Sequence, residues 1–182
     1  MRELALHVLD LLENAVDAHA NRIELYIDED LARDILSITV KDDGRGMTKE
    51  TLSRVLDPFY TTRTTRHVGL GLPLFAAAAQ RCNGSLSIDS EPGVGTVVTA
   101  VFQHSHIDRA PLGNVGASLL AVLLSDRPID LYYRHQANGQ CFELDTVAIR
   151  EQLADVPLSH PLVREWLQEV LADDLHVQQA LL

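Results

Sequence analysis

A strand-like stretch that runs directly into an acidic, glycine-rich turn constrains this chain more than any other feature. Residues 36–40 alternate apolar and polar side chains, which predicts a strand with one buried face. They lead into Asp42-Asp43-Gly44-Arg45-Gly46-Met47. A carboxylate at a strand end can accept a hydrogen bond from an exocyclic amine, and adjacent glycines let a flat ring approach the backbone. The turn therefore suits an adenine pocket, although most strings of this kind are ordinary turns.

The first expected helix, residues 2–19, carries a narrow polar strip on an otherwise apolar surface. The strip consists of His7, Asp10, Asn14 and Asp17, which recur at intervals of three and four and so share one face. Polar groups flanked by so much core are costly unless they contact water, a metal or a ligand. The spacing alone leaves two interpretations open, a solvent-facing strip and a binding surface.

Four further motifs surround the acidic turn in a fixed order. Before it stands Glu13-Asn14-Ala15-Val16-Asp17-Ala18. After it come Asp57-Pro58-Phe59-Tyr60-Thr61-Thr62, Gly69-Leu70-Gly71-Leu72 and Glu91-Pro92-Gly93-Val94-Gly95-Thr96. Together the motifs resemble the GHKL ATP-binding family, which includes DNA gyrase, the large heat-shock chaperones, histidine kinases and MutL-type repair proteins. The resemblance covers roughly residues 1–103, is strongest to the catalytic domain of histidine kinases, and suggests a small stand-alone protein.

This resemblance implies an ATP site and assigns roles within it. Asp42 matches the acceptor of the adenine amine, and Thr96 matches a threonine beside it that can bridge to the base through water. Asn14 matches the asparagine that supplies an oxygen to Mg²⁺, which keeps several waters and needs few protein ligands. The other implied ATP-binding residues are Asp17, Gly44, Gly46, Met47, Phe59, Thr61, Thr62, Gly69, Leu70, Gly71 and Leu72.

Asp10 lies one turn before Asn14 and leaves the reaction open. Hydrolysing members of the family usually carry a glutamate there, which orients the attacking water, whereas this aspartate is shorter by one methylene. In histidine kinases the same position is often an amide or another polar residue. The Asn-Ala-x-Asp-Ala string leans toward the hydrolysing branch. The helix therefore does not decide between hydrolysis and phosphotransfer.

Residues 57–68 have the composition of a lid over a triphosphate, with several hydroxyl groups and the cations Arg63 and Arg66. A plain solvated loop would also be polar. The glycine motif then leads into a helix, where exposed backbone N–H groups suit phosphate oxygens. Family members usually have another glycine and a small polar residue before it, where this chain has His67 and Val68. His67 then either touches the phosphates or, as we favour, faces water.

The pattern of elements predicts an α+β fold, a two-layer α/β sandwich. Alternation predicts strands at 23–28, 35–40, 86–88 and 97–101, with helices at 48–56 and from Pro73 to Ala79. Thr48 is the expected N-cap of the first of these helices, and Leu52, Val55 and Leu56 are expected to face the core. The sheet is antiparallel or mixed with helices on one face, which by resemblance is the Bergerat ATP-binding fold.

Residues 104–182 match no family member and are expected to form a C-terminal extension of unknown role. A buried helix at 113–124 precedes strands at 129–134 and 141–144, joined by a turn at Asn138-Gly139. A helix at 146–153 and a last helix capped by Ser159 follow. The extension packs either on residues 1–103, the ATP-binding domain, or on a partner. His104 and His106 are too few for a metal site and are interpreted as structural or surface residues.

Composition and charge limit the classes of partner and the cellular compartments that suit this chain. The formal net charge of −11 argues against nucleic acid, whose phosphates need clustered lysine and arginine. No apolar run is long enough to span a membrane, and the N-terminus has no signal-peptide pattern. Two cysteines, Cys82 and Cys141, show no metal or redox spacing. Together these features favour a reducing cytoplasm.

Two classes of function remain. The first is a Mg²⁺- and ATP-dependent, histidine-kinase-like module without its own phosphoacceptor or sensor, which acts on an unidentified protein partner, with Arg63 and Arg66 neutralising phosphoryl charge. The chain is expected to lack room for the helical hairpin that carries the acceptor. The second is a slow ATPase whose lid state switches a partner, with Asp10 as the water-orienting base, or a nucleotide sensor without chemistry. A homodimer is left open.

We predict that ATP slows tryptic cleavage after Arg63 and Arg66, because a lid that orders around nucleotide is a poorer protease substrate. The measurement is limited proteolysis with and without Mg-ATP, followed by mass spectrometry of the fragments. Equal cleavage rates in the two conditions would contradict a nucleotide-ordered lid.

Overall fold

One mixed sheet holds all the strands of the computed structural model, which describes residues 2–57, 71–125, 127, 129–172 and 174. Within those residues the sheet has six strands. They are β1 (Arg22–Asp30), β2 (Ile35–Asp42), β3 (Ser85–Glu91), β4 (Gly95–Gln103), β5 (Asp130–Ala137) and β6 (Gln140–Asp145). Their spatial order is β3-β4-β2-β1-β5-β6.

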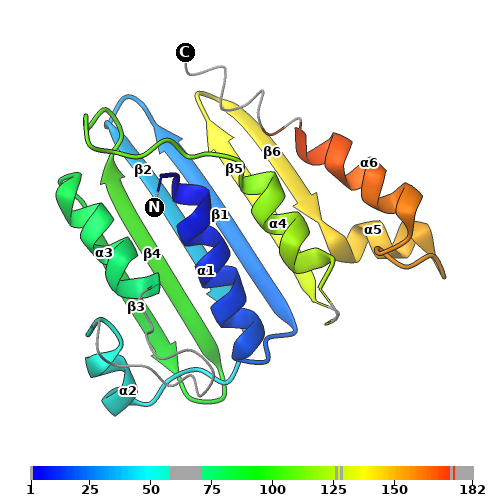
Figure 1. Cartoon of the computed structure of the whole chain (residues 1–182), viewed down its shortest axis with the longest axis horizontal. Helices are drawn as coiled ribbons and strands as arrows, with labels where there is room; N and C mark the ends of the chain where they lie inside the picture. Colours follow the sequence, from blue (N-terminus) through cyan, green and yellow to red (C-terminus); the bar gives the residue numbers. More distant parts are fainter. Residues whose placement is uncertain (1, 58–70, 126, 128, 173, 175–182) are drawn as a thin grey trace.

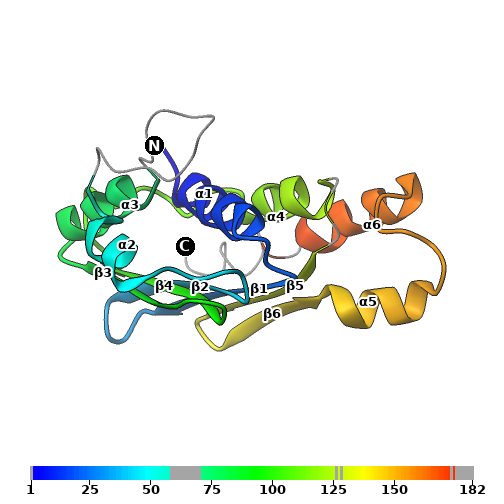
Figure 2. The same ribbon diagram turned by 90° about the horizontal axis from the view of Figure 1, so that it is seen from below.

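Helices cover one face of this sheet, as Figures 1 and 2 show. They are α1 (Leu4–Asp17), α2 (Lys49–Arg54), α3 (Gly71–Arg81), α4 (Val115–Leu123), α5 (Thr146–Leu153) and α6 (Pro161–Ala172). In Figure 2, α1, α3, α4 and α6 form one layer and the strands form the other, with α5 at one end. The predicted two-layer α+β architecture, with a mixed sheet and helices on one face, is confirmed.

β1 is the strand at which the two halves of the chain meet. It pairs antiparallel with β2 on one side and parallel with β5 on the other, from Arg22 opposite Asp130 to Glu29 opposite Ala137. β5 and β6 form the predicted hairpin, and its turn places Asn138 at φ 47° and Gly139 at φ 78°. Residues beyond the motif region therefore extend the same sheet. The division into domains at residue 103 stays a prediction.

The core lies between the sheet and the helices. On β1 the residues facing the helices, Ile23, Leu25 and Ile27, have no exposed surface. Leu12 of α1 is also fully buried, as is Phe75 of α3. Burial of each large apolar side chain contributes about 1.5–3 kcal/mol. The expected alternation in the strands and the apolar stripe of the first helix therefore become the two sides of one core.

A side chain of α4 and the backbone of the segment before it form hydrogen bonds to the first turn of α1. Ser118 Oγ donates a 2.9 Å hydrogen bond to the carbonyl oxygen of Ala5, inside the helix layer. The backbone N–H of Leu4 donates to Pro111 at 2.9 Å, and that of Ala5 donates to Leu112 at 2.8 Å. The first turn of α1 is thus fixed by residues from the C-terminal half of the chain.

Two local expectations are wrong. The helix α2 has no buried residue, and Leu56 is 43% exposed, so its apolar side chains do not face the core as expected. A helix of this length presents less than two turns and cannot offer a continuous apolar stripe. The predicted cap of the last helix, Ser159, is also wrong, because α6 begins at Pro161. The N–H of Leu162 donates to the ring of His160 at 3.3 Å. The Thr48 cap of α2 is confirmed, with Thr48 Oγ1 accepting from Thr51 N at 3.2 Å.

Candidate functional site

The acidic turn after β2 packs on the end of α1. The N–H of Arg45 donates a 2.9 Å hydrogen bond to the carbonyl oxygen of Ala18. A side-chain carbon at Gly44 would lie 2.8 Å from the Cβ of Ala18, closer than two such carbons approach. Glycine is therefore required here for the turn to touch the helix. This contact places the motif of β2 beside the motif of α1.

Asp42 and Thr96 face each other across β2 and β4. The Oδ1 atom of Asp42 accepts from the N–H of Gly44 at 2.8 Å, which orients its carboxyl group. Burial raises the pKa of Asp42, and the hydrogen bonds from the backbone N–H groups of Gly44 and Thr96 oppose that rise. The structure thus brings together a half-buried carboxyl group, a threonine and a glycine turn.

The adjacent Asp43 has a different role. Its Oδ1 atom accepts from the backbone N–H groups of Asn21 and Arg22, at 2.7 and 2.9 Å. Its own N–H donates to the carbonyl oxygen of Arg22 at 3.3 Å. Asp43 therefore ties the turn to the start of β1, and only the first acid of the pair is half-buried beside the turn.

Ser90, which the motifs did not single out, links three parts of this site. Its hydroxyl oxygen accepts from the N–H of Met47 at 2.8 Å and lies 2.9 Å from Thr96 Oγ1. It also lies 3.0 Å from the carbonyl oxygen of Gly95, to which it can donate. A signal was present in the sequence, because Ser90 takes the third place on a strand face that begins with Leu86 and Ile88.

Gly46 lets the turn dock on the β3–β4 connection. Its φ is 62°, in the region that side chains rarely adopt, and a Cβ atom there would lie 2.0 Å from the carbonyl oxygen of Glu91. The N–H of Gly93 donates to the carbonyl oxygen of Arg45 at 2.8 Å. The motifs that contain Gly46 and Gly93 are therefore in direct contact, as their resemblance to one nucleotide site requires.

The polar strip of α1 divides into a solvent-accessible part and a buried part. Asp10 and Asn14 are half-buried and Asp17 is exposed, consistent with a strip that borders a site. His7 is only 4% exposed and its ring stacks on Phe75 with centroids 4.8 Å apart. Burial, together with the N-terminal amine and Arg81, lowers the pKa of His7 to about 4. His7 is therefore a neutral residue of the core and not part of the expected polar strip.

Asp10 lies against the start of α3. A Cβ atom at Gly71 would lie 3.3 Å from the Cβ and 3.4 Å from the Oδ2 of Asp10. Leu72, the next residue of the glycine motif, packs partly buried against the core. The first turn of α3 is therefore adjacent to the carboxyl group of Asp10. Both elements of the expected phosphate end of the site lie on the same side of the sheet, as Figure 1 shows.

Several predicted residues lie outside the described part of the chain. They are Phe59, Thr61, Thr62, Arg63, Arg66, Gly69 and Leu70, together with His67 and Val68. Among the residues that are described, no group of three or more histidines, cysteines and acids is placed to hold a metal ion. The donors on α1 are the amide of Asn14 and the carboxyl groups of Asp10 and Asp17. These oxygen ligands fit Mg²⁺, whose coordination shell would be completed by water and phosphate oxygens.

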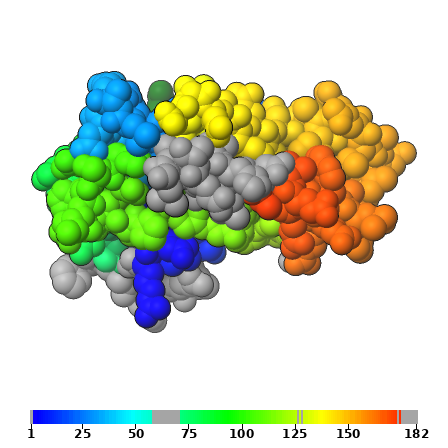
Figure 3. Space-filling model, turned by 90° about the horizontal axis from the view of Figure 1, so that it is seen from above, coloured from blue at the N-terminus to red at the C-terminus, as the bar shows by residue number. Residues whose placement is uncertain are grey.

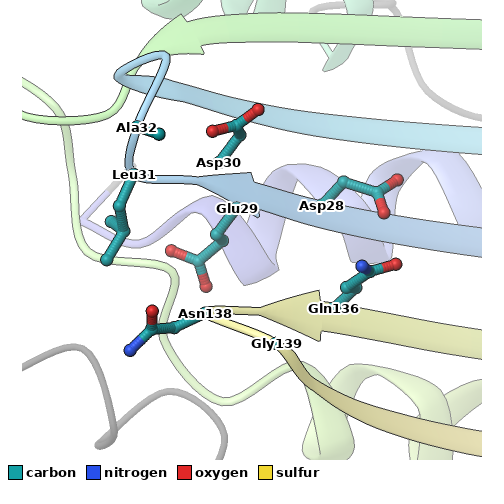
Figure 4. A pocket seen from close by; sticks show the side chains of 8 residues that line it. All are labelled: Asp28, Glu29, Asp30, Leu31, Ala32, Gln136, Asn138 and Gly139. Atoms are coloured by element: carbon teal, nitrogen blue, oxygen red, sulfur yellow. The ribbon is translucent and has the colours of Figure 1, made fainter.

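A separate pocket lies at the opposite end of β1. It has a volume of about 370 Å³. Figure 4 shows its lining, in which the end of β1 faces the β5–β6 turn. The lining residues are Asp28, Glu29, Asp30, Leu31, Ala32, Gln136, Asn138 and Gly139. None of them belongs to the nucleotide motifs.

No helix in the described part of the chain has the length and apolarity to cross a membrane.

Sequence comparison supports the resemblance to this ATP-binding family. Residues 2–106 match the family described as histidine kinase-, DNA gyrase B- and HSP90-like ATPase. The chain is 31% identical over 98 residues to the sensor histidine kinase YvrG of Bacillus subtilis, covering 52% of this chain and 17% of the relative. It is 39% identical over 108 residues to the sensor protein kinase FleS of Pseudomonas aeruginosa, covering 59% of this chain and 26% of the relative. The chain thus spans about a quarter or less of the length of these relatives.

Structural comparison agrees at the level of the fold. A crystal structure of the N-terminal domain of a DNA repair protein superposes with a TM-score of 0.54 at 16% identity. The match covers 80% of this chain and 53% of that one, so it reaches beyond the motif region. The family match spans more than half of the chain, and among the described residues its acidic turn lies beside the end of α1 and the start of β4. The chain belongs to the family of histidine kinase-, DNA gyrase B- and HSP90-like ATPases.

Proposed function

We propose that this protein is a Mg-ATP-binding, histidine-kinase-like catalytic module that acts on or regulates a partner protein by phosphotransfer. The observation that carries the proposal is the half-buried carboxyl group of Asp42, oriented by Gly44 and paired across the strands with Thr96. Such a group suits the exocyclic amine of adenine, and the adjacent glycines allow the ring close approach. The family, whose members are ATPases, supports this choice of ligand.

The phosphate end of the proposed site lies between the polar face of α1 and the start of α3. Asn14 is the proposed Mg²⁺ ligand, and Asp10 lies beside the start of α3, where backbone N–H groups at a helix N-terminus favour an anion. Bound Mg²⁺ neutralises charge on the phosphates. Arg63 and Arg66 are proposed to add positive charge to the transferred phosphoryl group. The protein's own residues thus position ATP at both ends.

Phosphotransfer is favoured because regions similar to this chain belong to proteins named as sensor kinases. In this proposal the phosphate acceptor is supplied by a partner protein. A second candidate is a slow ATPase that switches a partner. The proximity of Asp10 to Gly71 favours it, because a carboxylate there is placed to orient water near a phosphate. A nucleotide sensor without chemistry would use the adenine end alone.

Asp42→Asn is expected to weaken ATP binding by about tenfold, because the amide keeps an acceptor oxygen but loses the charge, and a hydrogen bond to a charged group contributes about 1.5–3 kcal/mol against about 0.5–1.5 for a neutral one. The matched control is Asp43→Asn, which removes the same charge one residue away and keeps an acceptor oxygen for the N–H groups of Asn21 and Arg22. Isothermal titration calorimetry and a thermal melt on each variant separate binding from folding. Equal affinities in wild type and Asp42→Asn would refute the adenine assignment.

Asn14→Ala is expected to abolish the tightening of ATP binding by Mg²⁺, because it removes the proposed metal ligand. The measurement is ATP affinity with Mg²⁺ and with EDTA. Glu13→Ala, on the neighbouring position of α1, is the control for loss of a polar side chain from this helix. If Mg²⁺ still tightens ATP in the Asn14 variant, another residue holds the metal.

Asp10→Asn separates the two reactions. With γ-labelled ATP and purified protein, we expect little free phosphate from the wild type and label retained on protein only when an acceptor is present. Phosphate release by the wild type that disappears in Asp10→Asn, while ATP still binds, would instead establish the ATPase switch. Both the released phosphate and the protein-bound label are followed in one time course.

A further inference from the structure

A chain of hydrogen-bonded ionisable groups is buried at the end of the sheet away from the nucleotide motifs. His104 Nε2 lies 2.7 Å from Glu29 Oε2, and His135 Nε2 lies 2.8 Å from Glu29 Oε1. On its other side, His135 Nδ1 lies 2.6 Å from Asp174 Oδ1. Tyr133 Oη donates to Asp174 Oδ2 at 2.9 Å. His135 has no exposed surface and Asp174 has 1%.

The geometry fixes the direction of these bonds. Both nitrogens of His135 face carboxylates, which only accept hydrogen bonds. A neutral imidazole donates from one nitrogen and presents a lone pair at the other, so it satisfies only one of the two carboxylates. The imidazolium satisfies both. We therefore treat His135 as a cation held between Glu29 and Asp174.

The pKa values agree with this geometry. Burial disfavours the charge on His135, but the hydrogen bonds to Asp174 and Glu29 outweigh it and raise the pKa of His135 to about 9. Burial likewise opposes ionisation of Glu29, and the bonds from His135 and His104 hold the pKa of Glu29 below its usual range. Burial and the nearby Asp174 carboxylate raise the pKa of Tyr133 well above its usual range, so this phenol stays a donor.

The network joins the C-terminal segment to the sheet. Glu29 lies on β1, His135 and Tyr133 lie on β5, and His104 follows β4. Asp174 follows α6, which buries Val163, Leu167 and Leu171. We propose that the ion pair between His135 and Asp174 is a latch for α6, and that loss of a proton from His135 releases α6 while the sheet stays folded.

Asp174 is the partner that leaves when His135 becomes neutral. Glu29 is held in the sheet by its backbone pairing with β2 and β5 and accepts a second hydrogen bond from His104. Asp174 lies beyond α6 and belongs to no strand, and His135 and Tyr133 are among its partners. Within the residues that the structure describes, the titratable groups facing His135 are Glu29 from β1, Asp174 beyond α6 and Tyr133 from β5. Phe142 of β6 is paired with His135 across the two strands, and α4 contains no titratable residue.

Release of α6 would uncover apolar surface. α6 packs on α4, and a Cβ atom at Gly116 of α4 would lie 3.1 Å from the Cβ of Leu171. Figure 3 shows α6 at the surface beside the hairpin of β5 and β6. Leu162 and Trp166 of α6 are 69% and 44% exposed, so one face of the helix lies open while the other packs on α4. The latch lies beyond the nucleotide site and does not depend on its assignment.

The direction of the pH dependence follows from the two shifts. A histidine whose folded pKa is raised contributes stability that is complete below about 6.5 and is lost as the pH rises through about 9. Glu29 still holds His135 when α6 is released, so the docking equilibrium of α6 shifts with pH only by the part of the interaction that Asp174 contributes. Glu29, whose folded pKa is lowered, contributes stability that is lost as the pH falls through that pKa. The latch is therefore closed near neutral pH and opens toward alkaline pH.

The test is hydrogen exchange of the intact chain between pH 6.5 and 9.5, corrected for the intrinsic dependence of exchange on pH. We expect protection of α6 amides to fall at least tenfold more than protection of β2 amides. Trp166, the sole tryptophan, lies on α6 and gives an independent fluorescence readout. Protection of α6 that follows β2 over the whole range would overturn the proposal.

Variants connect the effect to His135. His135→Gln should make the α6 profile independent of pH. Asp174→Asn should lower α6 protection near neutral pH and match wild type at pH 9.5, where the ion pair is already lost. Tyr133→Phe removes one neutral hydrogen bond, so it should weaken docking slightly and keep the pH dependence, which leaves a usable variant if the others fail to fold. His19→Gln, at an exposed histidine beyond the end of α1, is the control and should match wild type. An unchanged pH profile in His135→Gln would also overturn the proposal.

Discussion

The structure depends on the pairing of β1 with one strand from each half of the chain. β2 and β5 flank it along its length, and a carboxylate secures each end. At the start of β1, Asp43 accepts from the backbone of Asn21 and Arg22. At its end, Glu29 accepts from two histidines. β1 therefore holds the acidic turn after β2 in place, and it is also the strand to which the C-terminal half of the chain is attached.

Adjacent residues on this framework serve unlike purposes because their surroundings differ. Asp42 and Asp43 are neighbours, yet one is half-buried opposite Thr96 and the other is occupied by two backbone N–H groups. The same division occurs on α1. Asp10 borders the start of α3, whereas His7, one turn earlier, is stacked on Phe75 and neutral. A polar residue in a motif therefore becomes a candidate for binding only when its burial and its partners are known.

Periodicity predicted the elements well because burial and alternation are two expressions of the same physics. The strands, the helix layer and the Asn138-Gly139 turn follow from local patterns that the sequence displays. The failures occur where local signals compete. α2 is too short to bury a stripe, and Ser159 and His160 both offer an acceptor near the start of α6. The motifs predicted the parts of the site, whereas Ser90 was missed because a lone serine on a strand face is a weak signal.

The buried network marks the limit of such reasoning. Glu29 continues the alternation of Ile23, Leu25 and Ile27 on the buried face of β1, one residue beyond the strand that the sequence predicted. The sequence cannot predict the partners, because His104 is 75 residues away, His135 is 106 residues away and both depend on how distant strands align. An uncompensated buried carboxylate would be costly, and so would an isolated buried imidazolium. Each half of the chain therefore carries a charge that the other half neutralises, and this gives a physical reason for residues 104–174 to fold onto the motif region.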